Sequence, residues 1–137
     1  MREADLIVHA GDISTTAALE EIARLGPRVH AVHGNVDERD LRRRLPAELE
    51  LTQGGVTIAV THDAGPSRGR LARMRRRFPT AAAVIFGHSH MPLHDADEEG
   101  FQIFNPGSPN LRRGAPQHTM GIARIAGSSV SFEHVLL

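Results

Sequence analysis

The sequence predicts an α/β fold in a single domain that covers residues 1–137. Short apolar runs alternate with helical segments over the first two thirds of the chain, and this alternation is typical of a sheet with parallel strands. After Gly100 only short β runs follow, separated by turns, which predicts antiparallel strands added to that sheet or packed on it. Polar residues end four of the strands in the alternating part, and these residues indicate the chemistry.

Apolar runs bounded by turn residues define the expected strands. They cover residues 5–12, 28–35, 54–65, 81–90, 100–108, 119–127 and 128–137. Helices are expected over residues 14–26, 38–46 and 68–78. Ser14 or Thr15 can cap the first helix, and Gly26-Pro27 ends it.

Composition narrows the function class. Sixteen basic residues balance sixteen acidic ones, so net charge gives no reason to expect nucleic acid or an anionic membrane as a partner. The segment 68–78 carries six arginines, but the chain has no tyrosine or tryptophan to stack on bases. We interpret this helix as having a solvated face.

The absence of cysteine excludes disulfides and thiolate metal sites. No run is apolar over a membrane-spanning length and no signal peptide is recognisable, so we expect a cytoplasmic protein.

Four strand ends carry residues that can ligate a metal. They are Asp12 after Gly11, Asn35 after Gly34, His62 after Thr61, and His88 with His90 after Gly87. The carboxyl ends of parallel strands lie at one edge of a sheet, where α/β proteins bind their ligands. Oxygen from Asp and Asn together with nitrogen from His suits Mn, Fe or Zn. Alone, Gly-Asp and Gly-Asn would be read as turns, His62 as a hydrogen-bonded residue at a strand end, and His-x-His as a weak signal. Their joint occurrence predicts a metal site.

Five short motifs follow one another in a characteristic order. They read "GD" at 11–12, "GNVD" at 34–37, "TH" at 61–62, "GHSH" at 87–90 and "NPGS" at 105–108. This set resembles the calcineurin-like metallophosphoesterases. The closest match is their small bacterial and archaeal phosphodiesterase branch, which includes the metallophosphoesterase-like subunit of retromer. The resemblance runs from Asp5 to about Val135 and implies a four-layer αββα sandwich of two mixed β-sheets.

The resemblance also implies a role for each ligand. Asp12 would bridge two divalent ions, and His90 would belong to the second of them. The first ion would be completed by Asn35, His62 and His88. Asp37 matches an acidic position near the metals and is a candidate catalytic residue. Mn is the expected metal, with Fe, Zn and Ni as alternatives.

Such a pair of ions activates water and stabilises in-line attack on a phosphoryl group. The implied substrate is a small phosphodiester or phosphomonoester. The segment 105–108 would be either a restricted loop facing the site or a simple turn before the last strands.

One element of the family pattern has no counterpart. The pattern opens with Asp-x-His at the end of a first strand, and this sequence contains no such motif. We therefore expect the first strand and helix of the fold to be missing. A start assigned too late, a truncated chain or a genuine short variant would each account for the difference.

This difference bears on function. The second metal site would keep only Asp12 and His90, and two ligands rarely hold a divalent ion tightly. Impaired activity is therefore expected. A non-catalytic scaffold of the retromer-subunit type, which binds a protein partner, is the alternative function. Unpaired strand edges also favour a homodimer.

Overall fold

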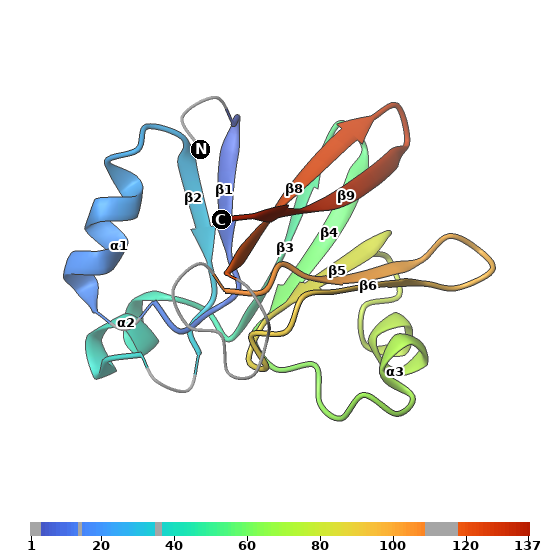
Figure 1. Cartoon of the computed structure of the whole chain (residues 1–137), viewed down its shortest axis with the longest axis horizontal. Helices are drawn as coiled ribbons and strands as arrows, with labels where there is room; N and C mark the ends of the chain where they lie inside the picture. The colour runs from blue at the N-terminus through green and yellow to red at the C-terminus, as the bar shows by residue number, and fades with distance from the viewer. Residues whose placement is uncertain (1–3, 14, 35–36, 109–117) are drawn as a thin grey trace.

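The computed structural model describes residues 4–13, 15–34, 37–108 and 118–137, and it confirms an α/β fold (Figure 1). The helices are α1 (Thr16–Ala23), α2 (Arg39–Arg44) and α3 (Arg70–Arg77). The strands are β1 (Leu6–His9), β2 (Arg28–Ala31), β3 (Glu48–Gln53), β4 (Val56–Thr61), β5 (Ala83–Phe86), β6 (Leu93–Ala96), β7 (Gln102–Asn105), β8 (Thr119–Ala126) and β9 (Ser129–Leu136). Within the described ranges, none of the helices has the length and apolar character needed to cross a membrane.

The strands form separate hydrogen-bonded sheets. β1 and β2 pair in parallel, and β8 and β9 form an antiparallel hairpin. The largest sheet has the order β3-β4-β5-β7-β6. Its central strands β4, β5 and β7 are parallel, whereas the edge strands β3 and β6 run antiparallel to their neighbours. The expectation of mixed sheets is therefore confirmed.

Strands β3 and β6 were not predicted, and β6 changes the topology. We expected the strands after Gly100 to be antiparallel, but β7 pairs in parallel with β5. The expectation is wrong for β7 because β6 lies between β5 and β7 in the chain and runs antiparallel to β7. The chain therefore reverses direction twice after β5, which makes β7 parallel to it. Apart from Leu93, the residues of β6 are exposed, so the sequence "LHDA" has no apolar pattern that would reveal a strand.

Three apolar clusters hold the elements together. One packs α3 through Met74 and Phe78 against Val84 and Ile103 on one face of the large sheet. A second fills the opposite face, where residues of β4 and β5 meet β1 and the β8–β9 hairpin. The third joins α1 and α2 to β2 around the fully buried Leu41. Figure 1 shows α1 and α2 on the β1–β2 side and α3 on the far side of the large sheet.

The arginines of α3 are not simply a solvated face, and that interpretation is corrected in part. Arg73 donates hydrogen bonds from its Nη2 to the carbonyls of Ala64 (2.7 Å) and Pro66 (2.6 Å). Arg70 donates to the carbonyl of Gly65 at 2.8 Å. These guanidinium groups therefore fix the segment that leads from β4 into α3.

Candidate metal centre

The predicted ligands that the structure describes converge, although they come from two different sheets. Nε2 of His62, which follows β4, lies 3.3 Å from Oδ2 of Asp12, which follows β1. Nε2 of His90 lies 3.7 Å from the same oxygen. Nδ1 of His88 lies 3.3 Å from Nε2 of His62. Asn35 lies outside the described residues. These described residues lie where two sheets meet rather than along the edge of one, and their role as metal ligands stays a prediction.

Backbone geometry sets these residues apart. Asp12, His88 and His90 adopt φ angles of 60°, 68° and 60°. This left-handed region is costly for residues with a Cβ, and non-glycine residues held there cluster at functional sites. In the described part of the chain, they are the only non-glycine residues with positive φ. The same three residues were chosen from the sequence as ligands, so the backbone singles them out independently.

His62 is oriented by a backbone carbonyl. Its Nδ1 donates to the carbonyl oxygen of Ala10 at 2.7 Å. This bond fixes the ring orientation and directs the Nε2 lone pair toward the carboxylate of Asp12. An imidazole held in this way is the usual arrangement for a histidine that binds a metal.

Two glycines allow the loops to meet. A Cβ on Gly11 would lie 2.4 Å from Nδ1 of His62, and a Cβ on Gly34 would lie 2.2 Å from Oδ1 of Asp12. Real Cβ atoms do not approach so closely, so only glycine permits these contacts. Gly11 therefore makes room for the ring of His62, and Gly34 makes room for the carboxylate of Asp12.

Asp37 connects two of the loops. Its Oδ2 accepts hydrogen bonds from the backbone N–H of Gly34 (2.6 Å) and of Asp12 (3.2 Å). The residue is 7% exposed. The carboxylate thus ties the loop after β2 to the loop after β1. This geometry suits a residue that positions ligands, and a direct catalytic role for Asp37 stays a prediction.

His9 is a supporting residue that the sequence did not reveal. Its Nδ1 accepts the backbone N–H of Gly11 at 3.2 Å, which requires that this nitrogen be unprotonated. Burial lowers the pKa of His9 below its ordinary value of 6.5, although the nearby Asp37 and Asp12 carboxylates offset part of this effect. His9 is therefore neutral in the folded protein near pH 7.

We expect His9 to make the fold less stable in mild acid. Below pH 6.5 the unfolded chain binds a proton at His9 more readily than the folded chain does, so the free energy of unfolding falls as pH decreases. His9→Asn, whose side-chain oxygen can still accept from Gly11, should show a shallower decline between pH 7 and 5 in urea titrations. Equal slopes for the two proteins would contradict this role.

Residues 1–128 match the model of the calcineurin-like phosphoesterase superfamily domain. The chain belongs to this family. It is also 30% identical over 134 residues to a probable metallophosphoesterase of Methanothermobacter thermautotrophicus, an alignment that spans 96% of this chain and 76% of the relative. The predicted family and its small archaeal and bacterial branch are thereby confirmed.

Solved structures show the same fold. Vps29 of Entamoeba histolytica, crystallised with Zn²⁺, is 22% identical and matches with a TM-score of 0.78 over 96% of this chain and 82% of its own. A protein described as a novel archaeal phosphodiesterase is 18% identical and matches with a TM-score of 0.74 over 98% of this chain and 84% of its own. At these identities the likeness establishes the fold and no more.

In this calcineurin-like chain, individual pairs of donor atoms have separations that suit a shared metal ion, but the described residues do not form a complete metal site. Two donors about 2.1 Å from one ion lie roughly 3–3.5 Å apart, and the separations of His62 from Asp12 and from His88 fall in that range. Within the described ranges, however, no three His, Asp or Glu side chains are placed so that they could hold an ion. A metal would therefore have to draw the ligands together, with Asn35 as a further candidate.

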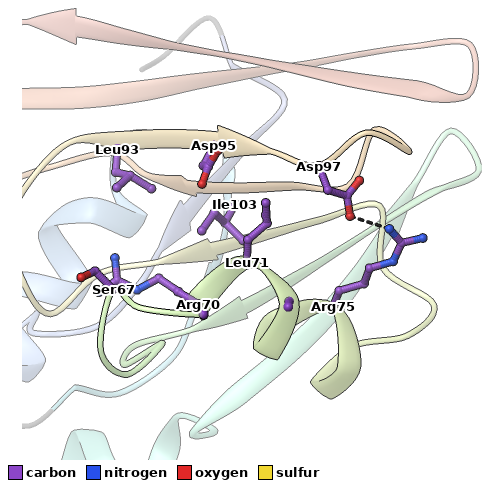
Figure 2. Close-up of a pocket in the computed structure, with 10 residues that line it drawn as sticks. Ser67, Arg70, Leu71, Arg75, Leu93, Asp95, Asp97 and Ile103 are labelled. Carbon is purple, nitrogen blue, oxygen red and sulfur yellow. Dashed lines mark hydrogen bonds and ion pairs between the residues drawn. The ribbon is translucent and has the colours of Figure 1, made fainter.

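An open pocket of about 500 Å³ lies away from these residues, between α3 and β6 (Figure 2). Leu71, Leu93 and Ile103 form its apolar wall, and Arg75 pairs with Asp97 at one end. Among the predicted ligands that the structure describes, none lines it. The pocket is thus separate from the candidate metal centre.

Proposed function

We propose that this protein is a metal-dependent phosphoesterase, and more specifically a phosphodiesterase that hydrolyses a small phosphodiester. The observation that carries the proposal is the approach of His62 to Asp12 and to His88, each with donor atoms 3.3 Å apart, at strand ends from two sheets. Membership of the calcineurin-like family supports the reaction class. The likeness to a structure described as an archaeal phosphodiesterase supports the choice of diester.

The proposed ligands of the first ion are Asp12, Asn35, His62 and His88, and those of the second are Asp12 and His90. We propose Mn²⁺, with Fe, Zn or Ni as alternatives; the zinc in the Vps29 structure supports a borderline divalent ion. When bound, such ions supply an activated water and stabilise charge on the phosphoryl oxygens. The chain itself contributes orientation, because the carbonyl of Ala10 aims His62 and the carboxylate of Asp37 holds the backbone of Asp12.

The finer architecture is part of the same proposal. We propose that the β1–β2 pair and the β8–β9 hairpin together represent one of the two mixed sheets of an αββα sandwich. Their joint packing on one face of the large sheet supports this assignment. Cytoplasmic localisation and homodimer formation stay predictions.

A non-catalytic scaffold is the second candidate. The likeness of this chain's fold to that of Vps29 supports it. Two observations argue against a scaffold. The backbone is left-handed at Asp12, His88 and His90, and a hydrogen bond orients the imidazole of His62. A protein-binding scaffold needs neither feature.

Hydrolysis of bis(4-nitrophenyl) phosphate with added Mn²⁺ tests the two functions. The phosphodiesterase proposal predicts release of nitrophenol that depends on Mn²⁺ and is lost on addition of a chelator. Isothermal titration with Mn²⁺ accompanies the assay. Metal binding without hydrolysis would favour the scaffold, and the absence of both would reject the metallophosphoesterase proposal for this chain.

The two histidines of the "GHSH" motif are expected to differ. His88 belongs to the site with the larger set of ligands, whereas His90 belongs to the site with two. We therefore expect His88→Ala to weaken the tightest Mn²⁺ binding at least about tenfold. His90→Ala should leave that affinity within about threefold and reduce only weaker binding. Because both residues have left-handed backbones, each variant serves as the conformational control for the other. Equal losses in titration calorimetry would contradict the assignment.

A further inference from the structure

The loop from Gly87 to His90 needs support from outside itself. His88 and His90 both have left-handed backbones, with φ of 68° and 60°. Each such residue costs about 1–2 kcal/mol relative to ordinary conformations. Within the loop, the backbone N–H of Ser89 donates to the carbonyl of Gly87 at 2.8 Å. A single bond of this kind contributes about 1 kcal/mol, which is less than the two strained residues cost.

Asn105 provides additional support from the neighbouring strand. It ends β7, which pairs with β5, and it is fully buried at 0% exposure. Its Nδ2 donates to the carbonyl of Gly87 (3.1 Å) and to Oγ of Ser89 (3.2 Å). Its Oδ1 accepts the backbone N–H of Gly107 at 2.9 Å. The carboxamide thus bonds to the histidine loop on one side and to its own turn on the other.

The backbone of Asn105 is fixed in turn by the last strand. Nε2 of His134 donates to the carbonyl oxygen of Asn105 at 2.7 Å. The ring of His134 also stacks on Phe104, with centroids 4.4 Å apart. Asn105 is therefore held through its main chain while its side chain holds the loop.

We propose that Asn105 is a positioning residue that keeps His88 and His90 in the conformation that binds metal. A buried carboxamide is unfavourable unless it is hydrogen-bonded, and both bonds from its Nδ2 go to this loop. Ser89 gains a role as well, since its hydroxyl receives one of these bonds between the two histidines. The metal part of this inference rests on the proposed function, whereas the loop part does not.

The experiment compares Asn105→Ala with Gln102→Ala. Gln102 is the matched control because it is a carboxamide on the same strand, but its Nε2 donates to the carbonyl of Val130 on β9 at 2.8 Å. Amide hydrogen exchange is measured by mass spectrometry on metal-free proteins, for a peptide that covers residues 87–91. Mn²⁺ affinity is then measured by titration calorimetry.

We expect at least about tenfold faster exchange of the loop in Asn105→Ala, with a 10–100-fold loss of Mn²⁺ affinity as for other outer-shell changes. Gln102→Ala should match the wild type in both. Unchanged loop exchange in folded Asn105→Ala overturns the proposal, and so does unchanged Mn²⁺ affinity. If the wild type binds no Mn²⁺, the proposed function fails, and the exchange result alone decides the role of Asn105.

Ser89→Ala keeps the test decisive if Asn105→Ala does not fold. This variant removes one of the two acceptors of the Asn105 side chain. Because Oγ of Ser89 also accepts the backbone N–H of Met91 at 3.3 Å, exchange is compared here for a peptide that ends at residue 90. Exchange of the loop several-fold faster than in the wild type supports the proposal. Wild-type exchange overturns it.

Discussion

Asp12→Asn is expected to abolish metal-dependent phosphodiester hydrolysis, with a loss of about 10³-fold or more in kcat/KM. Oδ2 of Asp12 is the atom that both His62 and His90 approach, at 3.3 and 3.7 Å. Asparagine has nearly the same shape but removes the negative charge that the two ions would share. A loss of several kcal/mol of charge stabilisation corresponds to a rate change of this size. Initial rates with a nitrophenyl phosphodiester and Mn²⁺ titrations measure it.

Asp63→Asn is the control for this prediction. Asp63 directly follows His62, is exposed, and bonds only locally through Oδ1 to the backbone N–H of Gly65 in the interactions described. We expect this variant to retain wild-type Mn²⁺ affinity and activity. Hydrolysis by Asp12→Asn at the wild-type rate would show that the reaction does not depend on a metal held by this carboxylate.

The second large effect is expected for Gly11→Ala. The added methyl group would lie 2.4 Å from Nδ1 of His62 and 2.9 Å from its Cγ. The ring would have to move, and its bond to the carbonyl of Ala10 would be lost. We expect a 10–100-fold loss of Mn²⁺ affinity because the ligand is no longer oriented. The free energy of unfolding should fall by about 1–2 kcal/mol from backbone strain and by about 1 kcal/mol more from the lost bond.

Gly26→Ala separates strain from displacement of the ligand. Gly26 has φ of 109°, close to the 103° of Gly11, but a Cβ there would have nothing within 4 Å. Its unfolding free energy should therefore fall by the strain alone, with Mn²⁺ affinity unchanged. Equal Mn²⁺ affinity in the two variants would show that the contact between Gly11 and His62 does not matter for the metal.

Local patterns predicted most elements but not the edge strands. The run "VTIAVT" consists of β-branched residues and alanine and marks β4, whereas β3 has Leu49 and Leu51 between exposed polar residues. Alternation over so few residues is a weak signal, and β6 has no alternation at all. Edge strands owe their conformation to pairing with a neighbour, and a single sequence does not show which neighbour is available.

The candidate ligands could be named from the sequence because their chemistry is local. An aspartate or histidine directly after a glycine at a strand end is visible in the residue order, as at Asp12 and His88. The supporting residues could not be named in this way. His9 looked like part of an apolar strand, Asp37 like a possible catalytic acid, and Asn105 like part of a turn.

The sequence by itself determined the family, the α/β class and the residues that could bind metal, because these depend on residue type and order. Only the tertiary structure decided that the candidate ligands it describes lie between two sheets and that β7 runs parallel to β5. It also decided which groups hold the ligands in place: Ala10 for His62, Asp37 for Asp12, and Asn105 for the histidine loop. Hydrogen bonds between residues distant in the chain depend on distances and directions that only the folded chain defines.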